Sequence, residues 1–212
     1  RRSRLAPALA ALMGGVALFV SNLNWLDPQI TPLVPVLKSY WLMIHVSVIT
    51  ASYGFFGICA ACGIASLAAT AFGRNLRELR AINEMAMIVG LALLTAGIFF
   101  GAVWANESWG RYWGWDPKET WALITMIVYA VTTHLHFIPR LNTNPLVFDV
   151  MSVVGFSTVL MTFFGVNYYL SGLHSYGKSE GFSPEIVLAA GAGVLVLVAV
   201  AAVRYHKNKK TS

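Results

Sequence analysis

Charged side chains are scarce in this chain of 212 residues. Asp, Glu, Lys and Arg make up 11% of the sequence, against roughly 25% in an ordinary soluble domain. The mean hydropathy is +0.65. So little charge excludes a soluble globular domain, and we predict an integral membrane protein. The net charge of +6 does not indicate nucleic-acid binding, because the basic residues lie at the ends of apolar segments, as membrane topology requires.

Several features of other protein classes are missing. Arg1, Arg2 and Arg4 precede an apolar run that lacks a small-residue cleavage site, so a secretory signal peptide is not expected. The sequence contains no internal repeat and no low-complexity linker. We therefore expect one membrane domain over residues 1–212. Because the first residue is not Met, we expect it to be a fragment of a longer chain.

Cysteine is also rare, with two residues, Cys59 and Cys62, in the run CAAC. Their spacing places both thiols on one face of a helix, where they would suit a redox pair. Packing is the favoured interpretation, because buried cysteine is common and no nearby polar or cationic group would activate a thiolate. Gly63 follows the second cysteine, so the histidine of a haem-attachment motif is missing.

Long apolar segments are abundant. A bilayer core of about 30 Å needs about 20 apolar residues, and six segments qualify, at roughly 5 to 21, 39 to 72, 82 to 105, 118 to 138, 148 to 170 and 185 to 204. The predicted fold class is all-α, a polytopic transmembrane helical bundle with about six spans. Eleven of the 15 basic residues lie at the two ends and in the connectors 73–81 and 139–147. By the positive-inside rule both ends face the cytoplasm, and the loop 106–117 faces outward.

Two histidines lie outside the predicted hydrocarbon layer. The segment 39–72 would be about 51 Å long as a helix, some 20 Å more than the hydrocarbon needs. Counting outward from Arg74 places His45 roughly 12 Å beyond the outer edge, and counting from Phe148 places His174 about 9 Å beyond it. Both histidines therefore lie on the side of the outward loop, at similar heights.

The outward loop contains the stretch WGRYWGWDPKETW at residues 109–121. Five of the seven tryptophans lie between residues 104 and 121. An interfacial aromatic belt is one interpretation, but a belt needs only about one or two aromatics per helix end. A surface for a planar apolar ligand is the other, with Gly110 and Gly114 allowing close approach. Asp116, Pro117 and Glu119 form a capping box that is expected to open a helix.

Neutral imidazole is the common axial ligand of haem iron. Taken singly, His45 and His174 are explained as hydrogen-bonded interface residues, but together they suit a six-coordinate iron above the aromatic loop. Zinc is disfavoured because no third and fourth ligand has a recognisable spacing. Near the inner end of the fourth segment, His134 and His136 are further functional candidates, since ionisable groups at that depth are costly. An iron there would need a ligand from elsewhere.

The stretch WGRYWGWDPKETW closely resembles the WWD motif of the haem-handling proteins. The resemblance extends to LKSYWLMIHVSVITASYG at 37–54 and SGLHSYG at 171–177, and so covers essentially the whole chain. Over this length the sequence is similar to the CcsA half of the System II cytochrome c synthases. The stretch LDPQITPLVPVLKSYW most resembles the versions in which the CcsB and CcsA halves are fused.

This resemblance implies a holocytochrome c synthase in an inner (cytoplasmic) or thylakoid-type membrane. Such a protein accepts haem b from the cytoplasmic side, moves it outward and joins it through thioether bonds to the CXXCH motif of apocytochrome c. By motif position, His45 and His174 correspond to the external axial ligands, and His134 to an inner ligand paired with a histidine of the CcsB (ResB-like) half. The family often has His-x-Arg where this chain has His134 and His136, so both remain candidates. The haem-contacting loop corresponds to Trp109, Gly110, Tyr112, Trp113, Gly114, Trp115 and Asp116.

Two other functions are compatible with parts of the pattern. A related WWD protein would hand haem to a chaperone without forming the thioether. A b-type electron-transfer subunit would need histidine pairs within the bilayer on adjacent helices, which this sequence does not offer. Three outward cations, Arg111, Lys118 and Lys178, are either partners of the haem propionates or solvated side chains.

Overall fold

The computed structural model describes residues 5–22, 37–74, 77–139, 141, 144–174 and 184–211. Over these residues the chain forms helices and no strand, which confirms the predicted all-α class. The main helices are α1 (Leu5–Asn22), α2 (Tyr40–Ala71), α3 (Arg77–Trp109), α4 (Pro117–Thr133), α5 (Pro145–Leu160), α6 (Val166–Tyr169) and α7 (Pro184–Thr211). A 3-10 turn at Leu135–Phe137 follows α4, and a π-helical turn at Met161–Gly165 joins α5 to α6.

Four of the described helices are long and apolar enough to cross a membrane, which indicates a multi-pass membrane protein. They are Tyr40–Ala71, Glu78–Trp109, Pro145–Tyr169 and Val187–Asn208. The expectation of about six spans is therefore wrong for the described residues. Helix α4 has 17 residues and α1 has 18; at 1.5 Å per residue these are about 26 and 27 Å long, less than the roughly 30 Å of a hydrocarbon core.

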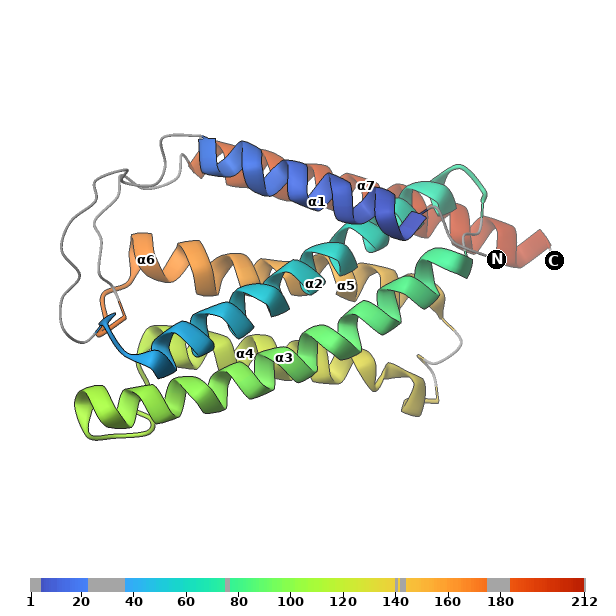
Figure 1. Cartoon of the computed structure of the whole chain (residues 1–212). Coiled ribbons are helices and arrows are strands. Elements are labelled where there is room, and N and C mark those ends of the chain that lie inside the picture. Colours follow the sequence, from blue (N-terminus) through green and yellow to red (C-terminus); the bar gives the residue numbers. More distant parts are fainter. Residues whose placement is uncertain are drawn as a thin grey trace.

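The long helices lie side by side and alternate in direction (Figure 1). Consequently the start of α2, the loop between α3 and α4, and the end of α6 meet at one end of the bundle. Helix α3 ends at Gly110, whose φ of 70° and N–H bond to the Asn106 carbonyl, at 2.9 Å, form a left-handed C-terminal cap. The predicted capping box at the start of α4 is confirmed, with Asp116 as N-cap and Pro117 in the first turn.

Helix α4 ends earlier than the predicted segment 118–138. Its last residue is Thr133, and His134 forms the C-cap. The His134 imidazole competes for the end of the helix, because Nδ1 lies 2.7 Å from the Ala130 carbonyl oxygen. Pro139 lacks an N–H and cannot continue a helix. His134 is thus an exposed side chain at a helix end, and the prediction that the helix continues past it is wrong.

Helix α2 lies at the centre of the bundle and packs against α3, α5 and α7. Its Phe56 ring stacks on Tyr129 of α4, with 3.7 Å between ring centroids. Helix α3 packs closely against α2 at Gly97 and Gly101. A Cβ at Gly97 would lie 2.6 Å from Ile49, and a Cβ at Gly101 would overlap the ring of His45. These glycines let α3 approach α2 where the candidate site begins.

A polar cluster lies among α2, α3 and α5 in the half of the bundle away from the aromatic loop. Arg80 and Asp149 form an ion pair at 3.2 Å, and Asn83 donates a hydrogen bond to Ser152 at 2.9 Å. Because every member is on a helix of the bundle, these contacts join helices.

Both cysteines of α2 are fully buried free thiols. The Cys59 Sγ lies 3.5 Å from the Asn83 carbonyl oxygen. Their burial favours the packing interpretation of the CAAC run over a redox pair.

Candidate functional site

A cavity of about 270 Å³ lies at the end of the bundle that carries the aromatic loop. Its size is near the lower end of small-molecule sites. Side chains of α2, α3, α4, the π-helical turn and the segment after α6 line it. The polar and aromatic lining residues include His45, Tyr53, Trp104, Tyr112, Trp113, Lys118, Glu119 and His174. His45 and His174, which are 129 positions apart in sequence (174 − 45), therefore share one cavity.

Helix α2 supplies His45, and α3 holds its ring in place. The ring lies against Gly101, and its Nδ1 is 2.7 Å from the Gly97 carbonyl oxygen. Since a carbonyl oxygen only accepts, Nδ1 carries the proton and donates it, so Nε2 of the neutral ring keeps its lone pair. The ring is nearly parallel to Trp104, at 13° and 6.3 Å between centroids.

His174 follows α6 and is held by the start of α4. Its Nδ1 is 3.0 Å from Oδ1 of Asp116. A carboxylate also only accepts, so Nε2 again keeps the lone pair. Burial lowers the pKa of His174 from its ordinary value of 6.5, and the nearby Asp116 carboxylate opposes that shift. The ring meets Trp104 and Trp109 edge-on, at 5.4 and 4.9 Å between centroids.

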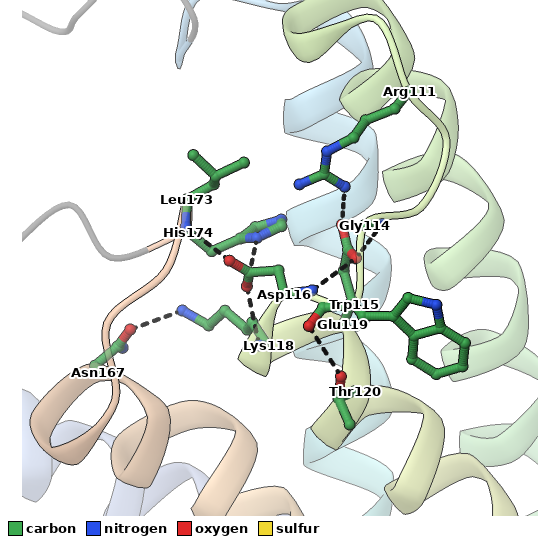
Figure 2. Close-up of polar contacts among 10 residues, drawn as sticks. All are labelled: Arg111, Gly114, Trp115, Asp116, Lys118, Glu119, Thr120, Asn167, Leu173 and His174. Carbon is green, nitrogen blue, oxygen red and sulfur yellow. Dashed lines mark hydrogen bonds and ion pairs between the residues drawn. The ribbon is translucent and has the colours of Figure 1, made fainter.

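Asp116 joins two segments that are distant in sequence (Figure 2). Its carboxylate accepts the Lys118 N–H at 3.0 Å, the Leu173 N–H at 2.7 Å and His174 Nδ1 at 3.0 Å. The first bond caps α4, and the other two hold the segment after α6. Gly172 allows this approach, because a Cβ there would meet the Asp116 carboxylate. One side chain thus caps a helix and orients His174.

Glu119 fixes the loop that leads into α4. Its Oε2 accepts the Gly114 N–H at 2.8 Å and the Asp116 N–H at 3.1 Å, and its Oε1 accepts from Arg111 at 3.3 Å. Between those two N–H groups, Trp115 has a φ of 56°. That conformation is uncommon for a bulky residue and costs of order 1–3 kcal/mol. The Glu119 bonds on both sides hold it in place.

The tryptophans of this region pack in pairs, with Trp104 edge-on to Trp109 at 4.7 Å between centroids and Trp113 edge-on to Trp115 at 5.8 Å. Trp104 is 1% exposed and contacts both imidazoles. Trp113 and Tyr112 line the cavity. Trp115 is 69% exposed and lies across the loop from His174 (Figure 2). Of the predicted haem-contacting loop, therefore, Trp109 lies beside the His174 ring and Trp115 points away from it.

The inner histidines lie away from this cavity. His134 and His136 are both exposed, and their ring centroids are 6.4 Å apart. Within the residues that the structure describes, no three His, Cys, Asp or Glu side chains gather as a metal site would require.

Sequence reasoning missed three contributions to the site. The contact of Asp116 with His174 spans 58 positions and has no local signal. The ring contacts of Trp104 with both imidazoles also have no local signal in the sequence. The third contribution is the position of the His45 ring, which lies against Gly101 with its Nδ1 bonded to the Gly97 carbonyl oxygen.

Comparisons with known proteins identify the family. Residues 2–174 match the profile described as "Cytochrome C assembly protein". The protein NrfI of Wolinella succinogenes is 50% identical over 188 residues, which are 85% of this chain and 21% of NrfI.

Two proteins named "Cytochrome c biogenesis protein CcsA" are also similar. The one from Chlamydomonas reinhardtii is 40% identical over 157 residues, 70% of this chain and 44% of that protein. The one from Guillardia theta is 36% identical over 201 residues, 80% of this chain and 66% of that protein. The chain thus spans between about a fifth and just under two thirds of these relatives. It belongs to the cytochrome c assembly protein family.

Proposed function

We propose that this chain holds haem between His45 and His174 and attaches it covalently to the CXXCH motif of an apocytochrome c. One observation carries the proposal. Both imidazoles line one cavity and both commit Nδ1 to an acceptor, while no hydrogen bond to either Nε2 occurs within the described part of the chain. Histidines that bind metals almost always donate their other ring N–H to a carboxylate or a carbonyl in this way.

Family membership and the cavity walls support haem as the ligand. The relatives carry names that refer to cytochrome c biogenesis. Apolar side chains such as Leu42, Val46 and Ile49 line the cavity together with the Trp104 and Trp113 rings. Such a lining suits the flat apolar body of a porphyrin and limits the access of water to the iron. Two imidazole ligands would give a six-coordinate, low-spin iron.

The covalent step is an addition that is neutral in redox terms. The sulfur of each apocytochrome cysteine bonds to the vinyl carbon next to the ring, and the thiol hydrogen ends on the outer vinyl carbon. The chain contributes positioning, since it holds the haem vinyl groups in place while the apocytochrome peptide binds. The histidine of the CXXCH motif then replaces one of the two imidazoles and the product leaves.

We extend the proposal to the inner face of the membrane. There His134 is the candidate ligand for incoming haem, with a histidine of a CcsB half, fused or separate, as the second ligand. The His134 Nδ1 is bound to the Ala130 carbonyl, as the two outer imidazoles are bound to their acceptors. This bond favours His134 over His136 as the candidate inner ligand. The positive-inside rule supports a cytoplasmic location for this site and an outer location for the cavity.

The optical spectrum of the purified full-length protein tests the ligand assignment. We expect a low-spin bis-imidazole haem in the wild type, and its loss in both His45→Ala and His174→Ala. The control is His206→Ala, which removes an exposed imidazole from α7. An unchanged spectrum in both cavity variants would exclude these residues as ligands.

Coexpression with an apocytochrome c in a host without its own maturation system tests the covalent step. Haem that stays attached to the cytochrome in denaturing electrophoresis is the expected result. Haem that binds the synthase but never becomes attached would favour the delivery protein instead.

A further inference from the structure

Lys118 is the one Lys or Arg among the described residues that line the cavity. It lies in the first turn of α4, two residues after the Asp116 cap. Its side chain runs from the helix toward α6 (Figure 2). A cation in a cavity with mostly apolar walls costs free energy unless an anion or a dipole meets it.

The partner of Lys118 is neutral. Its Nζ donates to Oδ1 of Asn167 at 2.9 Å, and the Asn167 Nδ2 donates to the Phe163 carbonyl oxygen at 2.7 Å. The second bond fixes the amide with its oxygen toward the lysine. An amide oxygen orients the ammonium group without cancelling its charge.

The nearest carboxylates have other partners. Asp116 accepts from two backbone N–H groups and from His174, and Glu119 accepts from two backbone N–H groups and from Arg111. Among the residues that the structure describes, no ion pair involves Lys118. Its charge is therefore available to a ligand in the cavity.

The other outward cations do not meet these conditions. Arg111 is paired with Glu119, and its guanidinium lies 5.6 Å from the centre of the Trp109 ring. Lys178 lies outside the described residues. Of the three cations that the sequence left open, the structure favours Lys118.

We propose that Lys118 receives a carboxylate of the bound tetrapyrrole, a haem propionate, and thereby sets the rotation of the macrocycle in the cavity. This inference rests on the proposed function. The propionates of haem b lie on one edge of the ring and the vinyl groups lie away from that edge. A propionate held at Lys118 would therefore direct the vinyl groups away from the start of α4. A charged hydrogen bond of this kind is short and strong.

The test compares haem with its dimethyl ester, in which both carboxylates are blocked. The two affinities are measured by optical titration of the full-length protein. We expect the wild type to bind the free acid about ten- to a hundredfold more tightly than the ester. Lys118→Met should abolish this preference and keep the bis-imidazole spectrum, whereas Lys118→Arg should retain most of it. The matched control is Lys38→Met, which removes an exposed lysine from the same end of the bundle.

Two results would overturn the inference. In one, Lys118→Met weakens acid and ester equally, which indicates a structural role. In the other, it leaves the preference for the acid intact. Both leave the proposed function in place, because the imidazole ligands are still observed. A wild-type protein that shows no bis-imidazole spectrum with either porphyrin would instead refute the proposed function and this inference with it.

Discussion

Replacing Asp116 with alanine tests how the candidate site is held together. The substitution removes the acceptor for the Lys118 N–H, the Leu173 N–H and His174 Nδ1. The first loss is that of a helix N-cap and costs about 1 kcal/mol. The second leaves a partly buried backbone N–H without a partner and costs about 1–3 kcal/mol. We expect Asp116→Ala to lower the free energy of unfolding by about 3 kcal/mol in total.

The third loss affects His174, the candidate ligand of the haem iron. Without Asp116 the His174 ring is free to rotate and Nδ1 has no fixed acceptor. Removing such a partner of a metal-bound histidine typically costs 10–100-fold in affinity, which is about 1.4–2.7 kcal/mol. Optical titration with haem measures this change, and thermal unfolding in detergent measures the loss of stability.

Two further variants separate the roles of Asp116. Asn144→Ala removes the N-cap of α5, whose side chain accepts the Leu146 N–H, so it should cost about 1 kcal/mol and leave haem affinity unchanged. Asp116→Asn should not rescue the site. An amide offers one acceptor oxygen, so in either orientation its NH₂ faces a backbone N–H. Haem affinity within about twofold of the wild type in Asp116→Ala would refute the reasoning, as would equal losses in Asn144→Ala.

Three other predictions follow from the same contacts. Gly101→Ala should weaken haem binding about tenfold, because a Cβ there would displace the His45 ring, whereas Gly54→Ala, with nothing within 4 Å, should not; an equal effect in both would contradict the assignment. Burial lowers the pKa of His174 below 6.5, so its Nε2 stays unprotonated at neutral pH. Haem affinity measured by titration should therefore be constant down to pH 6.5 and fall only below it, and a loss beginning well above pH 6.5 would contradict this. Asp149→Ala should lower stability by about 1–3 kcal/mol in thermal unfolding, because it removes the buried carboxylate that accepts a hydrogen bond from Arg80 of α3 at 3.2 Å; unchanged unfolding would contradict the pairing.

A local signal predicted one helix end. The pair Asp116 and Pro117 opens α4, because a capping box acts on its immediate neighbours. The end of α3 at the left-handed Gly110 lies beyond the predicted segment 82–105. The end of α4 and the π-helical turn at Met161–Gly165 were not predicted. In α4, His134 bonds back to the carbonyl of Ala130, a competition that hydropathy does not register.

The candidate site was predicted in part. The similar heights predicted for His45 and His174 follow from the lengths of the apolar segments, which the sequence gives, set against the thickness of a bilayer. Helix length and bilayer thickness do not tell which imidazole nitrogen of each histidine is hydrogen-bonded. That depends on Gly97 for one imidazole and on Asp116 for the other, and each acceptor comes from a segment that is distant in sequence from its histidine.

The amino-acid sequence by itself determined the all-α class, the membrane environment and the residues able to bind iron, because apolar length, charge placement and residue type are local quantities. The tertiary structure alone decided that the two imidazoles share one cavity, that each bonds an acceptor through Nδ1, and that Lys118 lines the same cavity with a neutral amide as its partner. The physical reason is that each of these depends on contacts between segments that are distant in sequence, such as Asp116 and His174, 58 positions apart, and such contacts exist only after the helices have packed.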